Sequence, residues 1–128
     1  MRLLLDTHAF LWFCADDPAL SPEAKSRIQD ARNDKFLSVA SIWEIAIKRS
    51  LGKLHLSVEL SELVAEGTIP NGIGILDVRT EHAVGVVALP FFHRDPFDRL
   101  LVAQALAERL TIVGGDTAFD AYPIRRIW

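Results

Sequence analysis

Four acidic residues stand at places in the chain where they could form one site. Three of them follow predicted strands and the fourth lies in the first turn of a predicted helix: Asp6, Glu44, Asp116 and Asp98. In a parallel sheet covered by helices, ligands bind beyond the carboxyl ends of the strands. We therefore expect the four carboxylates to converge at that edge.

Carboxylates that share one cleft repel each other, and burial increases the cost of keeping them charged. A divalent cation would relieve that repulsion. Oxygen-only ligands favour Mg²⁺, with Mn²⁺ able to substitute, and the sequence has no His and Cys cluster with zinc spacing. The pattern predicts a Mg²⁺ site that can hold one or two ions.

Each acid also has a purely structural interpretation. Asp6 can cap the helix that follows it, and Asp116 can serve in a turn after two glycines. Ser41 and Glu44 match a capping box, in which Ser41 opens a helix and Glu44 bonds back to its backbone. Asp98 can face the helix dipole. The shared location of the acids, rather than any single motif, favours a functional site.

Neighbouring residues add two further hypotheses. Asp95 competes with Asp98 as a ligand, but it precedes a proline and suits the N-cap, so we favour Asp98. Lys48, Arg94 and Arg99 lie close to the acids in sequence and could contact phosphates. The alternative is that Lys48 complements a helix dipole and that the two arginines are ordinary surface charges.

The elements that must position these residues alternate along the chain. Strands are expected at 3–5, 35–39, 73–78, 111–113 and 124–127, and helices at 7–15, 22–32, 41–51, 58–66, 80–89 and 96–110. The strand segments are uniformly apolar, as expected for strands covered on both faces. This order predicts an α/β fold with a mostly parallel five-stranded sheet flanked by helices.

Composition limits the class of protein. The chain has 128 residues, 50% of them hydrophobic and 24% charged, so we expect one globular domain over 1–128. A net charge of -3 excludes a strongly basic surface, so binding of nucleic acid must be local or metal-assisted. The single Cys14 and the lack of a signal or membrane-spanning segment favour the cytoplasm and no membrane association.

Four blocks of sequence resemble the PIN-domain family, and more closely its VapC-type toxins. The blocks follow one another in the same order and spacing and cover nearly the whole chain: 4–12, 41–48, 94–105 and 116–119. The resemblance implies a PIN-like fold and a Mg²⁺-dependent endoribonuclease acting on RNA. It also implies a homodimer and a cognate antitoxin protein that inserts a segment into the active site.

Carried over residue by residue, the resemblance places the catalytic and metal-binding acids at Asp6, Glu44, Asp98 and Asp116 and a supporting hydroxyl at Thr7. One position departs from the family pattern. Many members have Thr or Ser two residues before the last acid, whereas this chain has Gly114. An orienting hydroxyl is absent there, which leaves the contribution of Asp116 open.

The expected chemistry is hydrolysis of RNA by water, which leaves 5′-phosphate and 3′-hydroxyl ends. A signalling receiver domain would need paired acids after the first strand and a late lysine, but Thr7 follows Asp6 and no lysine follows Lys53. A haloacid-dehalogenase-type phosphatase would need an acid where His8 stands. A non-catalytic PIN-like RNA-binding domain and a PIN nuclease outside toxin–antitoxin systems remain as alternatives.

Overall fold

The computed structural model describes all residues, 1–128, and is built around a five-stranded sheet. The strands are β1 (Arg2–Leu5), β2 (Asp34–Ser38), β3 (Ile73–Leu76), β4 (Thr111–Val113) and β5 (Arg126–Ile127). Their order is β3-β2-β1-β4-β5, and every neighbouring pair is parallel. The predicted α/β class is confirmed, and the sheet is parallel throughout.

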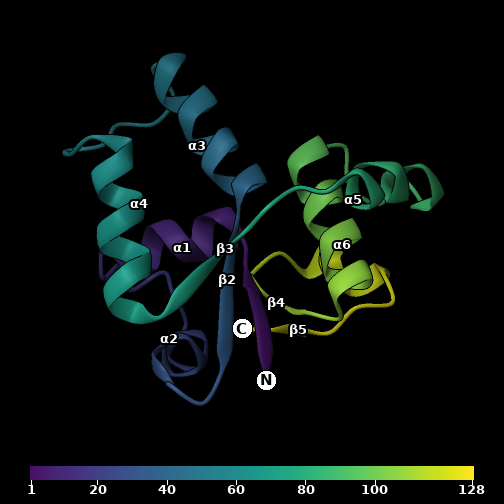
Figure 1. The fold of residues 1–128 in the computed structure, drawn as a ribbon, viewed down its shortest axis with the longest axis horizontal. Helices are drawn as coiled ribbons and strands as arrows, with labels where there is room; N and C mark the ends of the chain where they lie inside the picture. Colours follow the sequence, from purple (N-terminus) through teal and green to yellow (C-terminus); the bar gives the residue numbers. More distant parts are fainter.

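Helices cover both faces of this sheet. They are α1 (Thr7–Cys14), α2 (Pro22–Gln29), α3 (Val39–Ser50), α4 (Leu60–Thr68), α5 (Thr80–Gly85) and α6 (Pro96–Glu108), with short 3₁₀ turns at Ile69–Asn71, Val86–Ala88 and Thr117–Ala121. Figure 1 shows α1, α2 and α4 on one side of the sheet and α5 and α6 on the other. None of the helices has the length and apolar character needed to cross a membrane.

The central strand β1 explains why the sheet holds two separate apolar layers. Leu3 and Leu5 pack into the layer with Phe10 and Ile28, whereas Leu4 packs into the opposite layer against α6. All three leucines are completely buried. Burying each side chain contributes about 1.5–3 kcal/mol, so the register of β1 is strongly specified. The residue after Leu5 is thereby delivered to the middle of the carboxyl edge.

The start of α3 differs from the sequence prediction. The helix begins at Val39 rather than at Ser41, because the Ser38 side chain caps it by accepting a hydrogen bond of 3.0 Å from the Ala40 backbone N–H. Ser38 is also the last residue of β2, so strand and helix follow each other without a loop. The position of Glu44 is therefore fixed directly by the sheet.

Other boundaries shift by a few residues. The predicted helix 22–32 ends at Gln29, because Asp30 takes an extended backbone conformation and accepts a hydrogen bond of 2.9 Å from the Arg32 N–H. The predicted helix 80–89 is split into α5 and a 3₁₀ turn, and the predicted helix 58–66 runs from Leu60 to Thr68. These shifts leave the order of elements unchanged.

Candidate metal-binding active site

Asp6 lies at the carboxyl end of β1 and is almost fully buried. Its backbone N–H donates to the Val113 carbonyl at 3.0 Å, and its Oδ1 accepts from the Ala9 N–H at 2.7 Å, capping α1. The pKa of Asp6 is raised to about 6, mainly by burial and to a smaller extent by the nearby charges of Glu44 and Asp116. Asp6 is thus both a helix cap and a member of a carboxylate cluster.

Asp98 lies in the first turn of α6 and points into the same cluster. Burial raises its pKa to about 7, with added contributions from the charges of Asp95, Glu44, Asp6 and Asp116. Asp95 caps α6, since its Oδ1 accepts a hydrogen bond of 2.8 Å from the Phe97 N–H. Both acids are half-buried, but Asp98 lines the cavity of the cluster and has the raised pKa, whereas Asp95 has the capping role expected for it.

Glu44 is buried and is held through both of its carboxylate oxygens. Thr7 Oγ1 donates to Oε1 at 2.7 Å, and Lys48 Nζ donates to Oε2 at 2.6 Å. Ser41 Oγ lies 3.0 Å from Thr7 Oγ1 and supports the same group. The capping-box interpretation of Ser41 and Glu44 is therefore wrong, because these side chains turn toward α1 instead of the start of α3.

Asp116 is half-exposed and caps the 3₁₀ turn Thr117–Ala121. Its Oδ1 accepts from the Ala118 N–H at 2.9 Å, and its Oδ2 lies 3.1 Å from His93 Nε2. One ligand atom each from His93, Asp98 and Asp116 falls within 4.8 Å of the others, close enough to surround one cation. The last acid of the predicted set therefore lies beside Asp98.

The structure explains why glycine occupies position 114. A Cβ built there would overlap Asp6 Oδ2 and lie 2.9 Å from Asp6 Cγ. The Asp6 carboxylate thus occupies the space that a side chain at 114 would need. A hydroxyl-bearing side chain at this position would be incompatible with the observed Asp6 conformation. Glycine is therefore required for the Asp6 carboxylate to lie this close to the backbone at 114.

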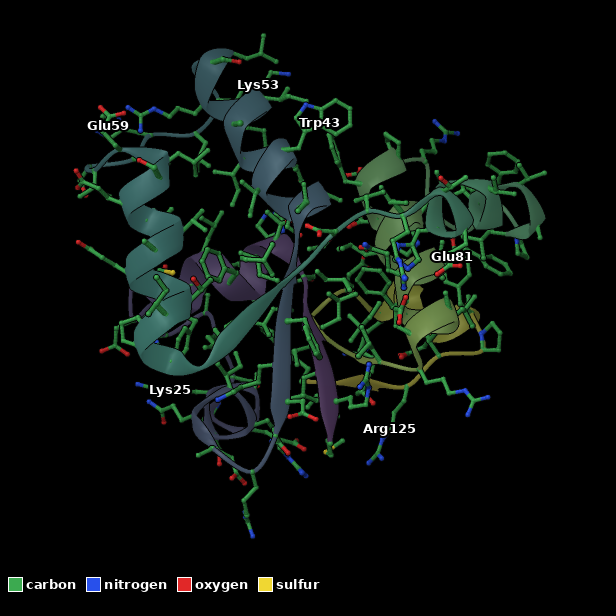
Figure 2. The ribbon with its side chains drawn as sticks, viewed as in Figure 1. Lys25, Trp43, Lys53, Glu59, Glu81 and Arg125 are labelled. Carbon is green, nitrogen blue, oxygen red and sulfur yellow. The ribbon has the colours of Figure 1, made fainter.

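The acids open onto a surface cavity of about 440 Å³. Asp6, Asp98 and Asp116 line it together with aromatic side chains that include Trp12 and Trp128, whose rings lie 5.8 Å apart. The exposed Trp43 points from α3 toward α6 and meets Phe97 edge-on (Figure 2). The site combines oxygen ligands with flat apolar walls.

The donor set fits a hard divalent cation. Burial raises the pKa of Asp6 and of Asp98, and the charges of Glu44 and Asp116 act on both in the same direction. A cation would relieve this repulsion. The four acids offer only oxygen ligands, which suits Mg²⁺ or Mn²⁺. Asp6, Asp98 and Asp116 line the cavity and would hold the ion from there, although only Asp98 and Asp116 belong, with His93, to the group of ligand atoms within 4.8 Å. Glu44 lies close enough to raise the pKa of both Asp6 and Asp98.

The three basic residues proposed as phosphate contacts lie in different surroundings. Lys48 is paired with Glu44, and this hydrogen bond raises the pKa of the lysine. Arg94 is exposed. Arg99 is buried, and its guanidinium donates to the carbonyls of Pro90 at 2.9 Å, Val86 at 3.1 Å and Leu89 at 3.3 Å. The phosphate role expected for Arg99 is corrected here, because its donors are occupied by backbone.

Sequence reasoning missed the specific surroundings of His93. The structure buries the ring of this histidine between Phe119 and Tyr122. Tyr122 lies 29 residues away along the chain. No local pattern signals such a pair, since its two members meet only in the folded sheet.

The fold and the site together define a class of proteins, the parallel α/β domains with a carboxylate cluster at the carboxyl edge of the sheet. A family model described as PIN domain matches residues 3–124. The match spans nearly the entire chain, so the chain belongs to the PIN-domain family. A comparison with curated proteins gave no match.

Several solved structures share this fold. VapBC2 from Rickettsia felis, bound to a DNA fragment from its promoter, superposes with a TM-score of 0.71 at 14% identity, covering 99% of this chain and 98% of that chain. DNA-bound VapBC from Salmonella typhimurium gives 0.65 at 21%, covering 99% and 97%. A toxin–antitoxin complex from Klebsiella pneumoniae gives 0.61 at 15%, covering 98% and 96%. At these identities the likeness concerns the fold.

Proposed function

We propose that this protein is a Mg²⁺-dependent endoribonuclease and the toxin of a type II toxin–antitoxin pair. The observation that carries the proposal is the convergence of Asp6, Glu44, Asp98 and Asp116 from four separate segments of the chain. Glu44 and Asp116 lie close enough for their charges to raise the pKa values of both Asp6 and Asp98. Such a cluster beside an aromatic-walled cavity suits a cation and a phosphodiester.

The chain's own residues would act by binding and orientation. Asp6, Asp98 and Asp116 hold the cation, and Thr7 and Lys48 fix the buried Glu44 carboxylate. A bound Mg²⁺ would neutralise charge on the scissile phosphate and lower the pKa of a coordinated water. Hydrolysis would form a bond from a water oxygen to phosphorus and break the bond from phosphorus to the ribose 3′ oxygen, with water losing one proton and the leaving oxygen gaining one. The products carry 5′-phosphate and 3′-hydroxyl ends.

The test is cleavage of a mixed RNA substrate by purified protein in Mg²⁺, EDTA and Mn²⁺. Activity should vanish in EDTA and return with Mn²⁺. Asp6→Asn, Glu44→Gln and Asp98→Asn should each reduce the rate at least 100-fold. Asp95→Asn is the matched control, since asparagine caps helices as well as aspartate does and removes the same charge. Full loss in Asp95→Asn with activity kept in Asp98→Asn would refute the assignment.

The ends of the products test the chemistry separately. A ligase specific for 5′-phosphates should accept the downstream fragments without prior phosphorylation. Attack by the ribose 2′-OH would instead leave 2′,3′-cyclic phosphate and 5′-hydroxyl ends and would require a general base. Cyclic ends, or activity that persists in EDTA, would exclude the mechanism. Retained RNA binding and tight Mn²⁺ binding without cleavage would exclude the nuclease.

The antitoxin part of the proposal has two supports. Similar solved structures are VapBC complexes and a toxin–antitoxin complex. In addition, a groove of about 570 Å³ runs beside the site between α1, α3 and α4, and nine of its 15 lining residues are hydrophobic. Expression of the chain should arrest bacterial growth, and co-expression of its cognate antitoxin should restore it. A PIN nuclease outside such systems would not be neutralised in this way.

A further inference from the structure

We propose that His93 is a positioning residue that holds the Asp116 carboxylate in place for the cation. This inference rests on the proposed function, since it concerns the same site. His93 lies in the loop before α6, and its Nε2 is 3.1 Å from Asp116 Oδ2. It is the one histidine that bonds directly to an acid of the cavity.

The ring of His93 is held rigidly by two aromatic neighbours. It is only 7% exposed, stacks on Tyr122 with ring centroids 5.5 Å apart at 11°, and lies 4.8 Å from the ring of Phe119. The Tyr122 hydroxyl accepts the His93 backbone N–H at 3.1 Å and lies 3.2 Å from its Nδ1. Backbone and ring are therefore tied to the same oxygen.

These contacts select one tautomer of the imidazole. An ionised carboxylate only accepts hydrogen bonds, so Nε2 must carry the proton that faces Asp116 Oδ2. The Tyr122 hydroxyl lies 3.2 Å from Nδ1, nearer than its 3.4 Å to the Pro90 carbonyl, and can donate to Nδ1 when that nitrogen carries no proton. Each donor is thus matched to an acceptor in the hydrogen bonds that run from Tyr122 to His93 and from His93 to Asp116.

Asp116 needs such support more than the other acids. Its side chain is 49% exposed, whereas Asp6 and Glu44 are buried. The Ala118 N–H fixes Oδ1 and His93 fixes Oδ2, which leaves further lone pairs on both oxygens for a cation. Gly114 supplies no hydroxyl, so His93 takes the orienting role at this acid. Hydrogen bonds to metal-binding carboxylates generally strengthen metal affinity.

A direct ligand role for His93 is the alternative. Its Nε2 lies within the group of three ligand atoms that could surround a cation. In the observed arrangement, however, Nε2 donates a hydrogen bond to Asp116 and therefore has no free lone pair for a cation. We therefore assign the carboxylate to the cation and the imidazole to the carboxylate.

The experiment uses Mn²⁺ alone, without RNA, on the full chain. His93→Gln keeps an amide N–H near the Nε2 position, whereas His93→Asn reaches only as far as Nδ1 and is the matched control. Binding is measured from the electron paramagnetic resonance signal of free Mn²⁺. His93→Asn should weaken Mn²⁺ affinity about tenfold, and His93→Gln should restore it to within about threefold of the unaltered chain. Equal affinities in both variants would overturn the proposal.

Two further readouts separate positioning from ligation and from folding. In metal-free protein, ¹⁵N NMR of the ring should show the Nε2–H tautomer, and Tyr122→Phe should shift the ring toward a mixture of tautomers. An Nδ1–H tautomer in the unaltered chain, or an imidazole nitrogen directly bound to Mn²⁺ in pulsed spectra, would overturn the proposal. Thermal unfolding without metal verifies that each variant is folded.

The two proposals fail in different ways. If the unaltered chain cleaves RNA but His93→Asn and His93→Gln bind Mn²⁺ equally, the positioning role is refuted and the nuclease stands. If the Mn²⁺ affinities and the tautomer follow the expected order but RNA stays intact, the nuclease is refuted and the positioning role stands.

Discussion

Single side chains at the carboxyl edge of the sheet have two roles at once. Asp6 caps α1 through the Ala9 N–H and also belongs to the acidic cluster. Asp116 caps a 3₁₀ turn and also bonds to His93. The structural and functional interpretations of these acids are therefore compatible, since a carboxylate has enough lone pairs to serve both a backbone N–H and a cation.

The first prediction at this scale concerns pH. The pKa values of Asp6 and Asp98 are raised from 3.8 to about 6 and about 7, so the folded state binds protons more tightly than the unfolded chain. Stability from these groups is fully present below pH 4 and is lost as the pH rises through 6 to 7. Without metal, Asp98→Asn should therefore raise the melting temperature at pH 8, by about 4 °C.

Circular dichroism melts in EDTA at pH 5 and pH 8 measure this effect. The gain from Asp98→Asn should be much smaller at pH 5, where the native carboxyl is already protonated. Asp95→Asn should give a smaller gain at pH 8, because it removes a neighbouring charge that raises the pKa of Asp98 while asparagine keeps the helix cap. Equal gains at both pH values would contradict the prediction.

The second prediction concerns Gly114. A methyl group there would overlap the Asp6 carboxylate and displace it from the Ala9 N–H. Gly114→Ala should therefore weaken Mn²⁺ binding and RNA cleavage about tenfold or more and cost about 1–3 kcal/mol of stability. Gly74→Ala is the matched control, since its new Cβ would make ordinary contacts with the Phe36 ring at 3.4 Å and the Lys35 carbonyl at 3.7 Å. Unchanged Mn²⁺ affinity in Gly114→Ala would refute the steric argument.

At the scale of elements, two junctions bring the acids together. Ser38 ends β2 and caps α3, and its Oγ also donates to Gln104 Oε1 on α6 at 2.6 Å. One residue thus links the helix that carries Glu44 to the helix that carries Asp98. The second junction is the segment before α6, where Arg99 ties three backbone carbonyls to the helix.

The third prediction tests that second junction. Arg99→Lys keeps the charge but cannot supply the planar set of donors that reaches Val86, Leu89 and Pro90. Buried carbonyls would lose partners, which should lower stability by about 1–3 kcal/mol. A denaturant titration measures the loss. The affinity for RNA, measured in EDTA, should stay unchanged, and a weaker affinity with unaltered stability would restore the phosphate role of Arg99.

At the scale of the whole molecule, the surface keeps large apolar side chains in the open. Trp43 is 60% exposed, Val87 87% and Phe91 85%, on α3 and on the segment between α5 and α6. Exposed apolar groups of this size in a small protein are typical of interaction surfaces. We propose that they contribute to a homodimer.

The fourth prediction follows from that surface. The chain should run as a dimer in light scattering at tens of micromolar, a concentration at which weak dimers form. Val87→Ser combined with Phe91→Ser should shift it toward monomer and leave the chain folded, because both side chains are already exposed to solvent. A strictly monomeric unaltered chain at that concentration would contradict the proposal.

Strand positions and helix starts could be predicted from the sequence because they depend on local patterns. The apolar run of β1 predicts a buried central strand, and the Asp95 cap predicts the start of α6. Capping bonds and strand periodicity involve neighbours a few residues apart, so their signal is present in short segments. The positions of the four acids relative to strands and helices, and hence their convergence, follow from these local features and the parallel order.

The groups that surround each acid depend on contacts between distant parts of the folded chain. Thr7 reaches Glu44 across 37 residues, and His93 reaches Asp116 across 23. Arg99, adjacent in sequence to Asp98, turns instead to the carbonyls before α6. The same short segment permits either orientation, because the choice depends on burial and on hydrogen-bond partners that distant elements supply when the sheet and its helices pack together.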